Sequence, residues 1–247
     1  MTIKINTDKQ KQPIIFFITQ TRPGNGGVES ITFVIERLKD FKPTIITNME
    51  LPINQRWRNS GAEVKHWPLF TIFSPIKFSI LKPIYKLGLW LLNNLRSYRE
   101  VRQINCKVVH FNDITTLTIA GLGAKLAGAS IIFNIRDTKI NKNLFKFKHI
   151  NWIIASRLSN KIVVLSKEMA SVWSHALRLK DKNKITYVYS TINTKLFKPV
   201  SAEEKQALRK KLGIPLNTIA IGYIASVTPK KNQLDLKKKP KNDIFSK

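Results

Sequence analysis

Short apolar runs rich in Ile, Val and Phe recur along the chain, and a turn and a helix-like pattern follow them. Apolar and polar residues do not alternate inside these runs, so we expect both faces of each strand to be buried. Parallel strands covered by helices have this pattern. The runs are Ile14–Thr19, Thr44–Thr47, Val64–Trp67, Lys107–Phe111, Ile131–Ile135, Lys161–Leu165 and Ile185–Tyr189.

Helix patterns lie between these strands. Val28–Leu38 carries one apolar stripe, Thr115–Ala127 is rich in small residues, and Ser166–Leu177 starts with a serine cap. The alternation of strand and helix predicts βαβ units. The fold class is therefore α/β, a Rossmann-like, doubly wound and mostly parallel sheet that fills residues 13–189.

The remaining residues divide into four segments. Residues 1–12 form a polar tail, and residues 190–217 read as a linker with a charged helix, Ser201–Leu212, that ends at Gly213. Residues 218–236 look like the start of a second, incomplete domain whose first strand is Thr218–Ala225. Residues 237–247 are Lys-rich and predicted to be disordered by composition.

The chain is strongly basic. Its 43 Lys and Arg residues exceed its 15 Asp and Glu residues and give a net charge of +28. This imbalance suits an anionic partner, which includes nucleic acid, acidic lipid and a phosphate-bearing substrate. The single cysteine, Cys106, excludes an internal disulfide and fits a reducing cytoplasm. We interpret Cys106 as a buried apolar residue.

A glycine-rich turn, Thr21–Glu29, joins the first strand to the first helix. Gly24, Gly26 and Gly27 let the backbone approach a ligand closely, and a helix N-terminus attracts phosphate. The turn matches neither the P-loop nor the dinucleotide fingerprint. The turn by itself is compatible with two interpretations, a phosphate site and a plain tight turn.

Two further polar positions follow predicted strands. His110 ends the strand Lys107–Phe111, and Arg136-Asp137 follows the strand Ile131–Ile135. Ligands of open α/β sheets bind at the carboxyl ends of strands. A buried histidine alone is more often structural, but three polar strand ends at one rim indicate a shared cleft.

The segment Leu69–Arg102 interleaves aromatic residues with Lys and Arg, and Glu100 is its one acid. An interfacial helix on anionic lipid has this composition, and so does an ordinary surface helix. Pro83 and Gly88 are predicted to interrupt any single long helix here.

No metal site is predicted. The four histidines, His66, His110, His149 and His175, lack metal-ligand spacing, and no nucleophile elbow is present. No run approaches the ~18 apolar residues of a membrane span. We therefore expect neither a metal nor another cofactor.

The order of these features resembles the retaining glycosyltransferases of family 4, which have the two-domain GT-B fold. The first matching segments are Gly26-Gly27-Val28-Glu29, Lys107-Val108-Val109-His110 and Lys161–Ser166. The later ones are the linker Val188–Pro199, the strand Ile221–Val227 and the tetrapeptide Lys230-Lys231-Asn232-Gln233. The sequence departs from the family at Arg136, where many members have His, and at Ser226, where many have Arg.

The resemblance implies roles for particular residues. The turn with Gly24, Gly26, Gly27 and Glu29 would face the donor diphosphate together with His110. Arg136 and Asp137 would be the catalytic pair close to the transferred sugar. Lys231 would bind the diphosphate and stabilise it as the leaving group.

The resemblance also implies a function. A nucleotide sugar would donate a hexose-like sugar to a lipid-linked or saccharide acceptor in bacterial envelope polysaccharide synthesis. The enzyme would be cytoplasmic, peripheral at the inner face of the membrane and impaired by truncation. Two alternatives remain, namely a non-catalytic module that binds the acceptor or the membrane, and a basic nucleic-acid-binding protein.

Overall fold

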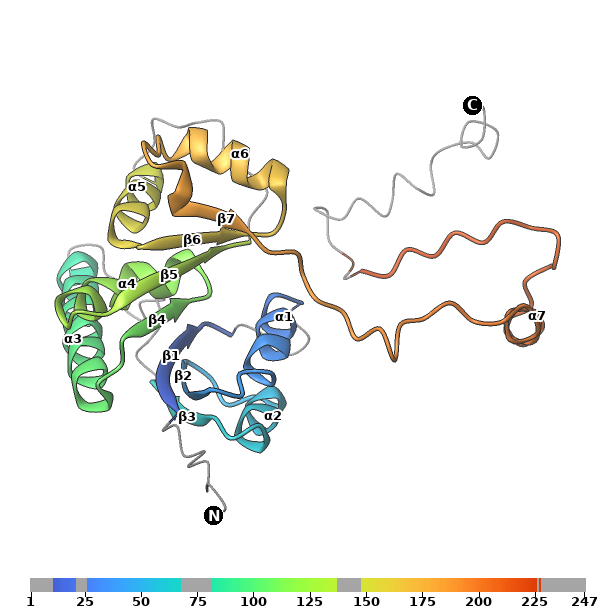
Figure 1. Cartoon of the computed structure of the whole chain (residues 1–247), viewed down its shortest axis with the longest axis horizontal. Coiled ribbons are helices and arrows are strands. Elements are labelled where there is room, and N and C mark those ends of the chain that lie inside the picture. The colour runs from blue at the N-terminus through green and yellow to red at the C-terminus, as the bar shows by residue number, and fades with distance from the viewer. Residues whose placement is uncertain (1–10, 21–25, 68–80, 137–147, 226, 228–247) are drawn as a thin grey trace, which may run out of the picture. The chain divides into compact units, whose positions relative to one another are not determined.

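The computed structural model describes residues 11–20, 26–67, 81–136, 148–225 and 227, which belong to two compact units, Met1–Ile192 and Asn193–Lys247. The first unit contains a seven-stranded parallel sheet in the order β3-β2-β1-β4-β5-β6-β7 (Figure 1). The strands are β1 (Gln12–Ile18), β2 (Phe41–Thr47), β3 (Glu63–His66), β4 (Val108–Phe111), β5 (Ser130–Ile135), β6 (Lys161–Val164) and β7 (Ile185–Tyr187).

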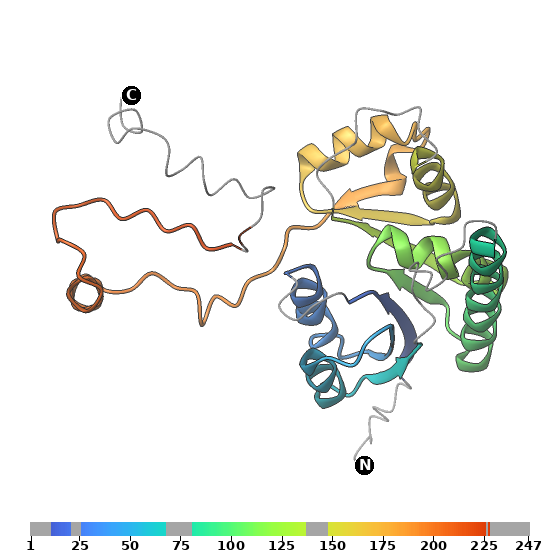
Figure 2. The same ribbon diagram turned by 180° about the vertical axis from the view of Figure 1, so that it is seen from behind.

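Helices connect these strands and cover both faces of the sheet (Figure 2). The helices of the first unit are α1 (Gly26–Ile35), α2 (Pro52–Asn59), α3 (Leu81–Ile104), α4 (Ile114–Leu126), α5 (Lys148–Leu158) and α6 (Lys167–Ala176), with a 3-10 turn at Lys182–Lys184. This arrangement confirms the predicted Rossmann-like, doubly wound α/β fold.

The two faces of β1 enter different apolar cores. Ile15 and Phe17 pack into the core under α3–α6, whereas Phe16 and Ile18 pack into the core under α1 and α2. All four side chains are almost fully buried. The absence of alternation in the sequence is explained by this burial on both sides, because each face of the strand contacts a helical layer.

The seven strands predicted for the sheet are present within a few residues, and so are the three predicted helices between them, as α1, α4 and α6. Asp113 and Ser166 cap α4 and α6, since each side chain accepts a hydrogen bond from a backbone N–H of the first turn. We predicted neither α2 nor α5. Pro52 could have indicated the start of α2, because it occupies the first position of this helix. Proline is common there, since the backbone N–H that it lacks would have no partner inside the helix.

The interruption predicted for Leu69–Arg102 is wrong within the described residues, because α3 continues without a break over 24 residues. Pro83 lies in the first turn, where backbone N–H groups have no partner inside the helix. Gly88 lies at an exposed position and costs a helix only about 1 kcal/mol. Among the helices described by the structure, none combines the length and the apolar content that a membrane crossing requires.

The second unit contains one described helix, α7 (Ala202–Lys211), as predicted. Ser201 and Glu204 cap it reciprocally, and Gly213 follows it with a positive φ. The strand predicted at Thr218–Ala225 is wrong, because these residues are neither helix nor strand. A strand requires a neighbour for its backbone hydrogen bonds, and the described part of this unit contains no other strand.

Candidate functional site

A polar pocket lies at the carboxyl ends of β1, β4 and β5, where the chain order of the sheet reverses at β1. Open α/β sheets bind ligands at such a switch point. The pocket has a volume of about 340 Å³. Its lining residues are Thr19, Gly27, Asn112, Asp113, Ile114, Asn134, Arg136 and Trp152.

A buried amide network fixes the loop that leads into this pocket. Gln20 follows β1, and its Nε2 donates to Thr47 Oγ1 and to Asn54 Oδ1, at 2.8 Å in each case. The backbone N–H of Gln20 donates to Asn48 Oδ1, and Asn48 Nδ2 donates back to the carbonyl of Gln20. The network therefore ties the ends of β1 and β2 together before the glycine turn begins.

Asp113 joins three elements at the pocket. One carboxylate oxygen accepts the backbone N–H of Thr116 at 2.9 Å and caps α4. The other accepts the hydroxyl of Thr19 at 2.7 Å, which ties the end of β1 to α4. Burial raises the pKa of Asp113, and the hydrogen bonds from Thr116 and Thr19 oppose this rise. We had not predicted Asp113 as a site residue, although a capping aspartate directly after a buried strand was a readable signal.

Arg136 supplies the positive charge of the pocket. Its half-buried guanidinium lies just after β5, as predicted. Burial lowers its pKa, and the negative charge of Asp113 acts in the opposite direction. The charge of Asp113 therefore stabilises the charged form of Arg136 in a partly dry environment, where electrostatic interactions are stronger than in water.

His110 lies on β4 beneath this rim and is not among the residues that line the pocket. Its ring packs against Phe16 at a centroid distance of 5.1 Å. Burial and the nearby charge of Arg136 lower its pKa to about 3. The imidazole is therefore neutral at physiological pH.

Four buried polar atoms near the pocket have no hydrogen-bond partner in the described part of the chain. They are His110 Nδ1, Asn112 Oδ1, Asn134 Oδ1 and Arg136 Nε. Buried polar groups are usually paired, because an unpaired one costs about 1–3 kcal/mol. Their concentration at one end of β4 and β5 makes this rim suited to a polar ligand.

The predicted glycine turn reaches the pocket through α1. Gly26 and Gly27 are the first two residues of this helix, and Gly27 lines the pocket. The positive end of the helix dipole is therefore at the pocket. Gly24, Asp137 and Lys231 were also predicted as site residues, and they lie outside the described residues.

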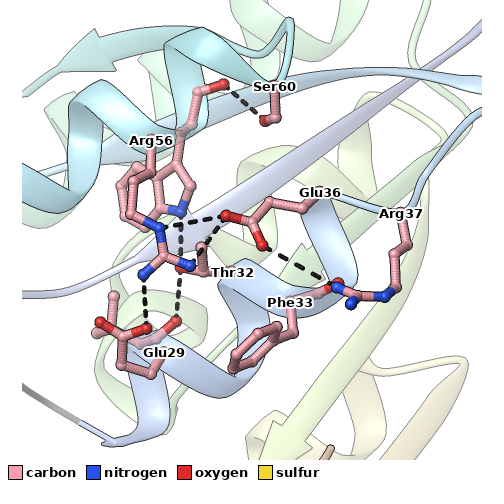
Figure 3. Close-up of polar contacts among 9 residues, drawn as sticks. Glu29, Thr32, Phe33, Glu36, Arg37, Arg56 and Ser60 are labelled. Carbon is pink, nitrogen blue, oxygen red and sulfur yellow. Dashed lines mark hydrogen bonds and ion pairs between the residues drawn. The ribbon is translucent and has the colours of Figure 1, made fainter. Parts of the chain in front are cut away.

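Glu29 does not line the pocket. Its carboxylate pairs with the guanidinium of Arg56 at 2.8 Å, and Arg56 also binds Glu36 at 2.9 Å (Figure 3). Burial lowers the pKa of Arg56, but the hydrogen bonds that Arg56 donates to the two glutamates outweigh burial and raise it overall. Glu29 thus joins α1 to α2, which the sequence pattern did not reveal.

No group of His, Cys, Asp or Glu residues in the described ranges could hold a metal ion. Cys106 is buried, and burial raises the pKa of its thiol. Its burial confirms the interpretation of this cysteine as an apolar residue, since an activated thiol requires a lowered pKa.

An apolar pocket of about 290 Å³ lies beside the polar one, and Ile114 lines both. The indole Nε1 of Trp90 donates to the carbonyl of Thr118 at 2.9 Å and so joins α3 to α4 at this pocket. The other residues that line the apolar pocket are Lys86, Leu89, Asn93, Thr115, Ile119 and Asn151.

No protein-family model and no curated protein matches the chain in sequence. Solved structures match it in fold. Anabaena Alr3699/HepE in complex with UDP is 13% identical, with a TM-score of 0.65 over 90% of this chain and 56% of that one. A glycosyltransferase from Rickettsia africae is 16% identical, with a TM-score of 0.58 over 84% and 51% of the two chains.

A third match comes from the trehalose-6-phosphate phosphatase N-terminal domain of Candida albicans, which is 13% identical with a TM-score of 0.52 over 81% and 54% of the two chains. The chain thus spans about half the length of these matches. At such low identities the likeness establishes the fold. It is a Rossmann-like α/β fold, which the chain shares with these solved structures.

Proposed function

We propose that the chain carries the acceptor-side domain of a nucleotide-sugar glycosyltransferase of family 4. The whole enzyme would transfer a hexose-like sugar to a lipid-linked or saccharide acceptor in bacterial envelope polysaccharide synthesis. The observation that carries the proposal is the polar pocket at the strand switch point, where α1 begins with two glycines and where Asp113 and Arg136 both line the pocket. The fold likeness to HepE, solved with UDP-glucose, supports the same class of donor.

The residues have separate roles in this proposal. The backbone at Gly26 and Gly27 and the positive end of α1 face the donor diphosphate. Arg136 binds the transferred sugar or its phosphate, and Asp113 keeps that guanidinium in place. Gly24, Asp137 and Lys231 complete the set by resemblance to the family. Glu29 is engaged by Arg56 and therefore positions α1 without touching the donor.

The proposed reaction exchanges one bond of the sugar for another. The bond between the anomeric carbon and the diphosphate oxygen breaks, and that oxygen keeps the electron pair. The acceptor hydroxyl bonds to the anomeric carbon and releases its proton, which ends on the departing diphosphate. Positive charge at Arg136 and Lys231 favours this charge separation. The proposal includes no metal and no cofactor besides the donor.

The apolar pocket next to the polar one supports an acceptor with an apolar part. Leu89, Trp90 and Ile119 provide a dry wall, and Lys86 provides a cation at the same pocket. A lipid phosphate combines these two chemistries. We therefore place the proposed enzyme at the cytoplasmic face of the membrane.

A binding experiment tests this proposal with the chain as it exists. The purified chain is titrated with UDP-glucose, other nucleotide sugars, free nucleotides and a short DNA duplex at two salt concentrations. We expect selective binding of one nucleotide sugar. Arg136→Met should weaken this binding about tenfold to a hundredfold, because a charge-assisted hydrogen bond contributes about 1.5–3 kcal/mol.

Arg157→Met is the matched control, because it removes the same charge from an exposed position on α5 and should leave binding unchanged. Absence of binding at millimolar donor, or binding that Arg136→Met does not alter, contradicts the proposal. Tight DNA binding that weakens steeply with salt favours the nucleic-acid alternative. Binding of an acceptor lipid without any donor favours the non-catalytic module.

A further inference from the structure

One face of α3 exposes a stripe of large apolar side chains. The exposed fractions are 67% for Ile84, 57% for Leu87, 54% for Leu91, 46% for Leu95 and 38% for Tyr98. The intervals of three and four residues place these side chains on the same side of the helix. The stripe extends along most of α3, which is about 36 Å long at the usual rise of 1.5 Å per residue.

The buried side of α3 carries polar side chains together with the apolar Val101. Asn93, Asn94 and Ser97 are almost fully buried on the side of the helix that packs against α4. Asn94 accepts the backbone N–H of Gly123 at 2.8 Å and donates to the carbonyl of Trp90. The helix therefore exposes a row of large apolar side chains, whereas an ordinary surface helix exposes mostly polar ones. An apolar environment in place of water accounts best for the exposed apolar stripe.

The charges on α3 indicate what this surrounding is. Lys86, Arg99 and Arg102 are exposed on the helix, whereas its one acid, Glu100, is buried and ion-paired with Lys65. The described surface of α3 thus combines apolar and cationic side chains with no exposed carboxylate. This combination is complementary to anionic headgroups above an apolar layer.

We propose that α3 lies in the plane of an anionic bilayer with Ile84, Leu87, Leu91, Leu95 and Tyr98 inserted below the headgroups. A second copy of the chain fits this face poorly. A symmetric contact through this face would bring the cations of one copy toward those of the other, and each chain already carries +28. The proposal stands on the α3 face alone and does not require the glycosyltransferase function.

Vesicle binding tests the proposal. The full chain is sedimented with vesicles of phosphatidylcholine and with vesicles of phosphatidylcholine and phosphatidylglycerol. We expect binding to the anionic vesicles. The triple variant Leu87→Ser, Leu91→Ser, Leu95→Ser should reduce it at least about tenfold, because it removes three of the apolar side chains that enter the bilayer.

The matched control removes three other exposed leucines by Leu126→Ser, Leu208→Ser and Leu212→Ser, and it should bind like the unmodified chain. A separate variant with Lys86→Gln, Arg99→Gln and Arg102→Gln should lose the preference for anionic vesicles and its salt dependence. Thermal unfolding of each variant shows whether it remains folded.

Fluorescence locates the inserted face even if a triple variant unfolds. Leu91→Trp should shift its emission to the blue when anionic vesicles are added, whereas Leu126→Trp should not. Equal loss of binding in the control triple variant, or a blue shift at both positions, overturns the proposal. A dimer that the Leu87, Leu91 and Leu95 changes convert to monomer, with vesicle binding unchanged, assigns the face to a second copy.

Discussion

At the scale of single residues, burial decides the chemistry of the candidate site. His110, Asp113 and Arg136 all lie near the carboxyl ends of neighbouring strands, and burial shifts the pKa of each toward its neutral form. The charge of Asp113 opposes this effect at Arg136, and hydrogen bonds from Thr116 and Thr19 oppose it at Asp113. At His110 the positive charge of Arg136 adds to the effect of burial. His110 is therefore a neutral structural neighbour of the pocket and does not supply a proton near pH 7.

The low pKa of His110 predicts a pH dependence of stability. The folded-state pKa is about 3 and the ordinary value is 6.5, so the unfolded chain binds the proton first as the pH falls. The contribution of His110 is complete above pH 6.5 and decreases by about 1.4 kcal/mol per pH unit between 6.5 and 3.

Urea unfolding of the chain and of His110→Gln across this pH range measures the effect. We expect the difference in unfolding free energy between the two proteins to change with pH at about that slope. His175→Gln, at an exposed position, should keep the slope of the unmodified chain. A slope that His110→Gln does not change would show that the imidazole is already charged or exposed in the folded protein.

At the scale of elements, the contact between α3 and α4 shapes the apolar pocket, which residues of both helices line. The small residues of α4 let the two helices approach closely. A Cβ at Gly123 would lie 1.9 Å from the backbone oxygen of Asn94, whereas one at Gly88 would meet nothing within 4 Å. The close approach also brings Trp90 within hydrogen-bond distance of Thr118.

This geometry predicts opposite effects for two glycine substitutions. Gly123→Ala should destabilise the fold by about 1–3 kcal/mol or more, because backbone atoms must separate to admit the methyl group. Gly88→Ala should stabilise it by about 0.5–1 kcal/mol, because alanine is the better helix former and finds open space. Urea unfolding curves of both variants provide the measurement. Similar effects of the two changes would contradict the described helix contact.

At the scale of the whole molecule, the net charge of +28 acts on every charged group at once. The described ion pairs join Arg37, Arg56, Arg58 and Lys65 to nearby glutamates. The 15 Asp and Glu residues of the chain are too few to pair one to one with its 43 Lys and Arg residues. Repulsion among like charges destabilises a compact chain.

Salt should therefore stabilise the free protein. We expect the urea midpoint of unfolding to rise when sodium chloride increases from low to physiological ionic strength, since the screening length falls to about 8 Å. Sodium fluoride at equal ionic strength is the control and should have a similar effect if screening is the cause. A midpoint that falls with salt would mean that the ion pairs contribute more than the repulsion.

Much of the fold followed from the sequence. Apolar runs and helical stripes depend on local periodicity, so they located the seven strands, three helices of the sheet domain and α7. The rule that ligands bind at strand ends also predicted that His110 and Arg136 lie in one region. The strand predicted at Thr218–Ala225 failed because an apolar run forms a strand only when a neighbour accepts its hydrogen bonds.

Only the tertiary structure decided which side chains face which surroundings. It assigned Glu29 to Arg56, placed Asp113 between β1 and α4, and buried polar side chains of α3. These assignments depend on contacts between residues far apart in the chain, which periodicity does not record. Asn94 is buried because Gly123 admits it, and the leucines on the other side of α3 are exposed as a result. The sequence alone thus determined the architecture and the charge, and packing determined the pocket and the exposed apolar face.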